Sequence, residues 1–126
     1  MGQGYLVDTN TIIDYLENKL PEKSNNLIDN ITIQFSVISR IELLVWRTAS
    51  EGQLKILNDF IGSSTVFDLN EDIVLKSIEI RKNYRLKLPD AIIAATAAVN
   101  NLTLLTRNIS DFEKVSIIKC IDPYHL

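Results

Sequence analysis

Four of the sixteen acidic residues lie close to predicted strand ends or helix starts. Asp8 ends the first strand, and Glu42 lies one turn into the helix after the second. Asp90 begins the apolar helix at 89–100, and Asp111 follows the fourth strand. The carboxyl ends of strands form the crevice where an open parallel sheet binds ligands, so we expect Asp8 and Asp111 to face one another. Carboxylates gathered on that edge are the hard oxygen ligands that Mg²⁺ or Mn²⁺ prefers.

Such a cluster predicts hydrolytic chemistry on a phosphate ester. Converging carboxylates repel one another, and burial makes their charge costlier, so a bound cation removes the conflict. A divalent cation also lowers the pKa of an attacking water and stabilises the charge that develops on phosphorus. Hydrolysis of a phosphodiester is therefore the expected reaction.

Each acid also has a purely structural explanation. Asp8 would cap the helix that follows it, Asp90 would complement a helix dipole, and Asp111 would close an Asx turn. Glu42 would end a capping box, although Ser36 is the better helix start and leaves Glu42 beyond the cap. Each structural explanation stays possible for its own residue. Together they do not explain why all four acids should lie at the same edge of the sheet.

Apolar periodicity predicts strands that alternate with helices along the chain. Short strands are expected at residues 5–7, 33–35, 65–67, 103–105 and 116–118. Helices are expected at residues 9–17, 27–31, 37–45, 51–61, 71–81 and 89–100. Strands separated by helices cannot pair as hairpins, so the sheet should be parallel and covered on both faces. We predict an α/β fold, a three-layer α/β/α sandwich with about five parallel strands, formed by residues 1–126 as a single domain.

Composition sets further limits. With 126 residues, 46% of them hydrophobic and 23% charged, the chain has the size and composition of one globular domain. Residues 91–99, the longest mostly apolar stretch, are far fewer than the ~20 that cross a bilayer, and no membrane association is expected. Cys120 is the only cysteine, which excludes an intramolecular disulfide and favours the cytoplasm. A net charge of −3 excludes a broad basic surface, so nucleic acid would be bound through local cations.

A basic run at residues 81–87 precedes Asp90 and contains Tyr84, a ring on which a base could stack. A solvated helix end whose cations complement the dipole explains this run equally well. Two more arginines either contact phosphate or pair with neighbouring acids. The candidate RNA-binding residues are Arg40, Arg81, Lys82, Arg85, Lys87 and Arg107.

Four segments together resemble PIN-domain proteins of the VapC toxin type. They read VDTN at 7–10, SRIEL at 39–43, LPDAIIAATA at 88–97, and LTRN with DF at 105–108 and 111–112. The resemblance spans almost the whole chain. It implies a parallel five-stranded sheet, a divalent-metal-dependent endoribonuclease and neutralisation by a small antitoxin encoded alongside. A homodimer is also expected.

Carried over by position, the resemblance assigns metal binding and catalysis to Asp8, Glu42, Asp90 and Asp111. Side chains that would orient ligands, water or phosphate around them are Thr9, Asn10, Thr106 and Asn108. Some relatives carry an acid in place of Asn108, so one-metal and two-metal mechanisms both stay open. The implied reaction is in-line attack by water on a single-stranded or looped RNA, which leaves a 5′-phosphate. Asp8 and Asp90 would fix the metal, and Glu42 or Asp111 would assist proton removal.

Other function classes fit the sequence less well. A haloacid-dehalogenase-like phosphatase requires a second Asp two residues after the first, where Asn10 stands. A receiver domain requires paired acids and a late lysine that are not evident, and no GxxxxGK or GxGxxG motif is present. The remaining alternative is a PIN-like RNA-binding or RNA-maturation protein without a toxin role.

Three single residues complete the expectations. Trp46 is expected in the core or at a dimer interface. Cys120 is expected to be an inert packing residue. His125 is the only histidine and lies one residue from the end of the chain, so the acidic site has no histidine for attack by a 2′-hydroxyl.

Overall fold

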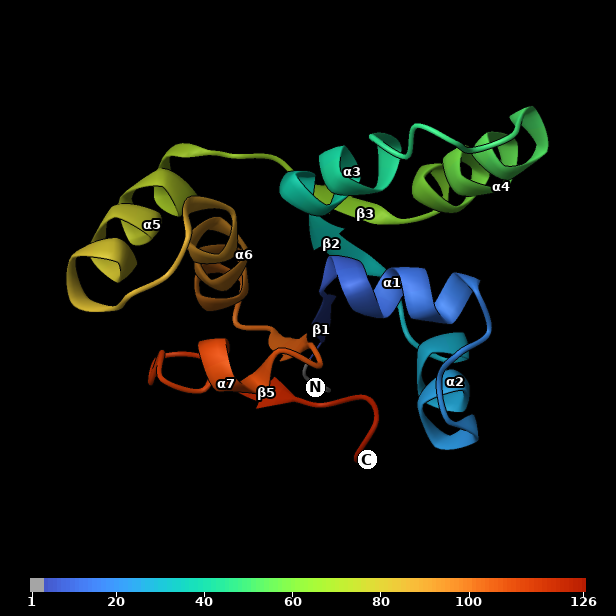
Figure 1. The fold of residues 1–126 in the computed structure, drawn as a ribbon. Coiled ribbons are helices and arrows are strands. Elements are labelled where there is room, and N and C mark those ends of the chain that lie inside the picture. Colours follow the sequence, from blue (N-terminus) through green and yellow to red (C-terminus); the bar gives the residue numbers. More distant parts are fainter. Residues whose placement is uncertain (1–3) are drawn as a thin grey trace.

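The computed structural model describes residues 4–126; the first three residues lie outside the described part. Within it, short parallel strands alternate with helices (Figure 1). The strands are β1 (Tyr5–Val7), β2 (Gln34–Ser36), β3 (Thr65–Phe67), β4 (Thr103–Leu105) and β5 (Cys120–Ile121). The helices are α1 (Thr9–Leu16), α2 (Glu22–Asp29), α3 (Val37–Leu44), α4 (Glu51–Gly62), α5 (Glu71–Asn83), α6 (Leu88–Val99) and α7 (Ile109–Phe112).

The strands form two parallel hydrogen-bonded groups. One group has the order β1-β4-β5 and the other pairs β2 with β3. The groups meet where β2 lies beside β1, and there the Gln34 side-chain amide donates to the Tyr5 carbonyl at 3.3 Å. The prediction of about five parallel strands is confirmed, but the backbone ladder is interrupted between β1 and β2.

Two hydrophobic cores lie on opposite faces of the strands, because successive strand residues point to opposite sides. Leu6 and Leu104 pack against α5, α6 and α7 in the first core. Their neighbours Val7 and Leu105 pack against α1, α2, α3 and α4 in the second. Helices therefore cover both faces, as the predicted three-layer sandwich requires.

Side-chain caps fix where several helices begin. Ser36 Oγ accepts from the Ile38 amide at 3.0 Å before α3, and Asn70 Oδ1 accepts from the Ile73 amide at 3.0 Å before α5. Before α4, Ser50 and Gln53 form a reciprocal capping box. Pro89 lies in the first turn of α6, where its missing amide hydrogen has no intrahelical partner to lose. Because α3 begins at Ser36, Glu42 is free of a capping role.

One local expectation was wrong. The last strand is β5 at residues 120–121 and not 116–118, because the Ile118 amide turns back to the Val115 carbonyl. Buried Val115 places this turn ahead of the strand. Asp111 lies in a short helix, α7, and its side chain accepts a hydrogen bond from Asn108. Trp46 is 43% exposed, so it is not a core residue, and its expected place at a dimer interface stays a prediction.

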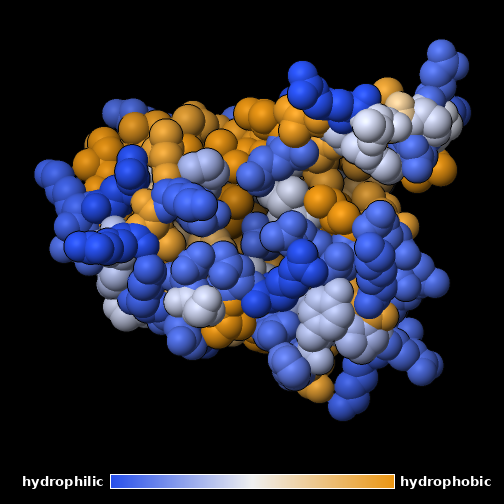
Figure 2. All heavy atoms as spheres, in the orientation of Figure 1, coloured by the Kyte–Doolittle hydropathy of each residue, from blue (hydrophilic) through white to orange (hydrophobic). Residues whose placement is uncertain are grey.

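Apolar side chains also reach the surface. Figure 2 shows hydrophobic atoms gathered over α5 and α6 on this view of the molecule, where Leu75, Ile78 and Leu88 are among the exposed residues. Among the described helices, none combines the length and apolar character needed to span a bilayer.

Candidate active site

Asp8 lies at the carboxyl end of β1 and is held from both sides. Its Oδ1 accepts from the Thr9 amide at 2.9 Å, as the cap of α1, and its Oδ2 accepts from Thr106 Oγ1 at 2.8 Å. Its own amide donates to the Leu105 carbonyl at 2.9 Å. The carboxylate is therefore fixed to the ends of β1 and β4, and only 7% of the residue is exposed.

The loop after β4 continues this network to a second acid. Buried Thr106 accepts from the Asn108 amide at 3.0 Å through the same hydroxyl that binds Asp8. The Asn108 side chain then donates to Asp111 Oδ2 at 2.9 Å. Two residues assigned supporting roles from the sequence thus connect Asp8 with Asp111.

Glu42 reaches the same edge from α3. Thr9 Oγ1 donates to Glu42 Oε1 at 2.6 Å and lies 2.8 Å from the buried Ser39 hydroxyl. Thr9 therefore ties the start of α1 to α3, and it stands directly after Asp8. Asn10, the other flanking residue, is exposed.

Asp90 stands in the first turn of α6 and is the fourth acid of the group. Burial raises its pKa, and the negative charges of Asp8, Asp111 and Glu42 raise it further. The pKa of Asp8 is also raised, first by burial and then by Glu42, although hydrogen bonds from Thr106 and Thr9 oppose the shift. The four acids are close enough to act on one another electrostatically.

The donor set fits a hard divalent cation. As the side chains stand, no group of three or more His, Cys, Asp or Glu within residues 4–126 is close enough to hold a metal ion. Mg²⁺, however, commonly uses only one or two protein carboxylates and keeps several waters. Burial disfavours the charges of Asp8 and Asp90, and a bound cation would offset that cost.

The candidate RNA-binding residues are distributed unevenly around the acids. Lys87 lowers the pKa of Asp90 and Arg107 lowers that of Asp8, so both cations lie near the acids. All six candidates are exposed, and the pKa shifts of these acids show no such effect of Arg40, Arg81, Lys82 or Arg85. Tyr84 is half-buried against the first core, and its hydroxyl lies 3.0 Å from the Ser116 hydroxyl. Part of its ring is therefore committed to packing.

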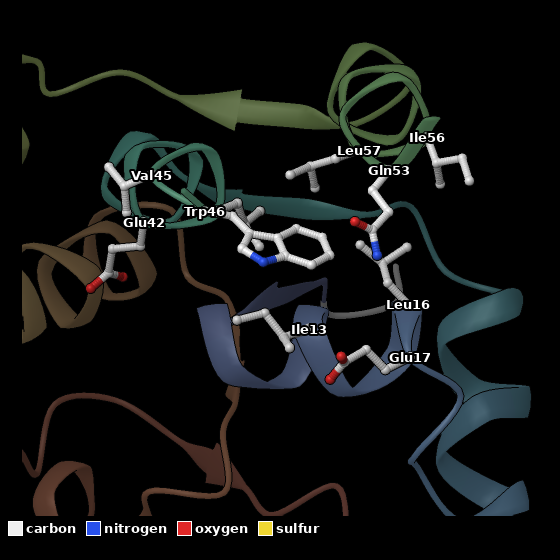
Figure 3. A pocket seen from close by; sticks show the side chains of 10 residues that line it. Ile13, Leu16, Glu17, Glu42, Val45, Trp46, Gln53, Ile56 and Leu57 are labelled. Carbon is white, nitrogen blue, oxygen red and sulfur yellow. The ribbon is translucent and has the colours of Figure 1, made fainter. Parts of the chain in front are cut away.

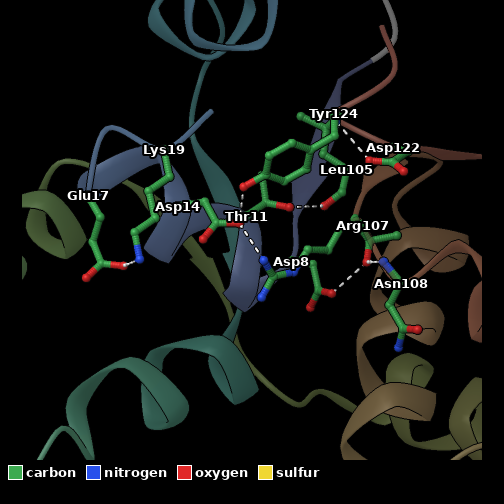
Figure 4. Close-up of polar contacts among 11 residues, drawn as sticks. Asp8, Thr11, Asp14, Glu17, Lys19, Leu105, Arg107, Asn108, Asp122 and Tyr124 are labelled. Carbon is green, nitrogen blue, oxygen red and sulfur yellow. Dashed lines mark hydrogen bonds and ion pairs between the residues drawn. The ribbon is translucent and has the colours of Figure 1, made fainter. Parts of the chain in front are cut away.

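Two residues beside the site were missed from the sequence. Asp14 on α1 is 5% exposed, and its Oδ2 accepts from Arg107 Nη1 at 3.0 Å and from Tyr124 Oη at 2.7 Å (Figure 4). A buried carboxylate requires such partners. The available signal was an acid on the face of α1 that also carries buried Thr11, three residues earlier. Its partners lie more than ninety residues away in the chain, which no local pattern reveals.

Comparisons with known proteins agree with this geometry. The PIN domain family model matches residues 5–118. The structure is similar to one from a toxin-antitoxin complex of Klebsiella pneumoniae, with 28% identity, a TM-score of 0.80, and coverage of 98% of this chain and 100% of that one. It is similar to one from DNA-bound VapBC of Salmonella typhimurium, with 27% identity, a TM-score of 0.83, and coverage of 96% and 98%.

A third solved structure, a VapBC complex from nontypeable Haemophilus influenzae, shares the fold at 23% identity, with a TM-score of 0.79 and coverage of 94% of this chain and 96% of that one. A comparison with curated protein sequences gave no match. The family model covers nearly all of the described residues, including all four acids. The chain therefore belongs to the PIN domain family.

Proposed function

We propose that this chain is a divalent-metal-dependent endoribonuclease, the toxin of a type II toxin-antitoxin pair, acting on cytoplasmic RNA. The observation that carries the proposal is the network that joins Asp8 to Asp111 through Thr106 and Asn108. In a PIN-domain chain whose structural neighbours include toxin-antitoxin complexes, a VapBC complex among them, this network supports a nuclease site.

The proposed mechanism divides the work among the acids. Asp8 and Asp90 would hold a Mg²⁺ or Mn²⁺ ion, which supplies a lowered pKa for water and stabilises charge on phosphorus. Glu42 Oε1 is occupied by the Thr9 hydroxyl, which leaves Oε2 to accept the proton of the attacking water. Asp111 is held by Asn108 and is the alternative proton acceptor. Water attacks phosphorus in line with the P–O3′ bond, which breaks, so one product carries a 5′-phosphate and the other a 3′-hydroxyl that takes up a proton from solvent.

Removal of the metal tests the function directly. We expect the protein to cut total RNA internally with Mn²⁺ or Mg²⁺, and to lose at least about a hundredfold in rate with EDTA, because the cation stabilises transition-state charge by several kcal/mol. Mapping the new ends should give 5′-phosphates. Equal cleavage in EDTA, or 2′,3′-cyclic ends, would contradict the proposal. Cleavage without growth arrest on expression would favour the RNA-maturation alternative.

An apolar groove beside Glu42 gives the proposed antitoxin a docking surface. The groove, of about 510 Å³, lies between α1, α3 and α4 (Figure 3). Val45 and Ile56 on its wall are 63% and 65% exposed, which is unfavourable unless a partner covers them. An amphipathic helix that lays its apolar face in such a groove is a common recognition mode. Because Glu42 is part of the wall, an occupant would also approach the acids.

The single tryptophan reports on this docking. Trp46 lines the groove and is 43% exposed, so we expect its emission to shift to the blue when the protein encoded by the neighbouring reading frame binds. Ile56→Glu should abolish the shift and weaken binding at least about tenfold, because it puts a charge into an apolar contact. The exposed Leu75→Glu on α5 is the matched control. Equal loss in both variants would contradict the assignment of this groove.

The expected homodimer stays a prediction. The exposed apolar side chains of α5 and the start of α6, Leu75, Ile78 and Leu88, are its candidate surface. The Leu75→Glu control therefore also reports on oligomeric state. Analytical ultracentrifugation of the same variant separates a lost dimer from a lost antitoxin contact.

A further inference from the structure

The carboxyl-terminal segment crosses back to the side of the molecule that carries α1. Buried Pro123 accepts a hydrogen bond from Ser24 on α2 through its carbonyl. Next to it, the Tyr124 amide donates to Asp122 Oδ1 at 2.8 Å, which fixes the turn. These contacts present the Tyr124 hydroxyl to Asp14, as Figure 4 shows.

Asp14 receives two donors from different segments of the chain. Tyr124 Oη belongs to the terminal segment, and Arg107 Nη1 belongs to the loop after β4. Both bind the same oxygen, Oδ2, of a carboxylate whose side chain is 6% exposed. A buried carboxylate depends on its donors, so this contact fixes the direction of the Arg107 side chain.

The remaining part of the Arg107 guanidinium is available to a ligand. The side chain is 47% exposed, and within residues 4–126 its only bonded partners belong to this group with Asp14 and Tyr124. Arg107 directly follows Thr106, the residue that binds Asp8. In Figure 4 its guanidinium lies between Asp14 and Asp8. Arg107 therefore places a positive charge, held in one direction by Asp14, beside the group of four acids.

A substrate phosphate is the ligand that this arrangement suits. The chain has a net charge of −3, and its four acids repel a polyanion, so an RNA strand requires a cation placed beside them. The planar fork of a guanidinium binds two phosphate oxygens at once, which an ammonium does not. We propose that Arg107 binds an RNA phosphate next to the scissile one, and that Asp14 and Tyr124 are positioning residues that hold its guanidinium in place. This inference rests on the proposed nuclease function.

RNA binding measured without cleavage tests the role of Arg107. The probe is a short fluorescent single-stranded RNA, titrated in EDTA at several KCl concentrations. Arg107→Ala should weaken binding by about 10-fold to 100-fold and reduce the slope of log K against log salt by about 0.7. Arg107→Lys should keep the slope but lose affinity, because the fork is gone. Lys23→Ala, which removes an exposed cation of α2, is the matched control and should change neither quantity.

A double-mutant cycle tests the positioning residues. Tyr124→Phe removes one hydroxyl and should weaken RNA binding several-fold when Arg107 is present, and not at all in the Arg107→Ala background. If Tyr124 has only a structural role, Tyr124→Phe should lower the Tm and leave the RNA Kd unchanged, or it should change the Kd by the same factor with and without Arg107. Either result overturns its role. Arg107→Ala leaves the buried Asp14 carboxylate without its cation, and the variant could unfold for that reason. In that case the double variant Asp14→Asn/Arg107→Ala, which removes this buried charge, takes the place of Arg107→Ala in the cycle.

The outcomes separate the two proposals. Wild-type protein that cuts RNA while Arg107→Ala binds as tightly and with the same salt slope would overturn this inference alone. Wild-type protein that neither binds nor cuts RNA would overturn the nuclease function and this inference with it. Both proposals are supported if Arg107→Ala weakens RNA binding and reduces its salt dependence, and if the effect of Tyr124→Phe on binding depends on Arg107.

Discussion

Asp8→Asn is expected to reduce RNA cleavage by at least about 10³-fold, because several kcal/mol of transition-state stabilisation depend on a cation that this carboxylate would hold. The substitution is nearly isosteric. The Asn side-chain oxygen can still cap α1, since Asn and Asp are equally good caps. The loss should therefore come from removed charge and not from a disturbed fold, and single-turnover cleavage of a defined RNA in Mn²⁺ measures it.

The same substitution, Asp8→Asn, should increase the free energy of unfolding although it reduces activity. Burial and Glu42 raise the pKa of Asp8 above its ordinary value, so protonated Asp8 favours the folded state, and this contribution is lost as the pH rises through the folded-state pKa. Without divalent metal, Asp8→Asn should therefore unfold at higher urea concentration than wild type at pH 7. The difference should shrink as the pH is lowered through the raised pKa of Asp8, because the wild-type carboxyl group then takes up its proton.

An exposed acid provides the control for both measurements. Asp59 lies near the carboxyl end of α4, which leads into the amino end of β3 and so to the sheet edge opposite Asp8. Asp59→Asn removes the same charge from an exposed surface pair with Lys55. It should leave the cleavage rate and its pH dependence unchanged. An Asp8→Asn variant that retains more than about a tenth of the wild-type rate would remove Asp8 from the proposed chemistry.

The sequence predicts well those features that depend on residues close together in the chain. Asp8 follows an apolar run and precedes a helix, and both facts are local, so its place at a strand end was foreseeable. The caps at Ser36 and Asn70 depend on contacts two or three residues away. Alternation of strand and helix then dictates a parallel sheet, because sequential strands have no hairpin connection.

The features that escaped prediction depend on tertiary contacts. The position of β5 is set by Val115, which is fully buried, and by the pairing of Leu104 with Cys120. Asp14 and Tyr124 meet across 110 residues, and nothing near either one marks the pair. The roles of the four acids and of the supporting residues stay predictions that the proposed variants test.

Phe112 connects the stability of the fold to the site. It is fully buried in the first core from α7, a single helical turn that has few hydrogen bonds of its own. Asp111 and the Asn108 cap belong to the same turn, so the packing of one phenyl ring holds the loop on which Asp111 stands.

Phe112→Ala should therefore cost about 3–5 kcal/mol of unfolding free energy, through lost burial and the cavity left behind, from a total of about 5–15 kcal/mol. It should also lower the cleavage rate at temperatures where the variant is still folded, because Asp111 loses its support. Urea unfolding and single-turnover cleavage measure the two effects. The exposed Leu69→Ala, in the segment between β3 and α5, removes apolar atoms without leaving a cavity and should stay within about 0.5 kcal/mol of wild type. A cost below about 1 kcal/mol for Phe112→Ala would mean that backbone contacts hold α7 without its ring, since such a small change is typical of sites that are not packed.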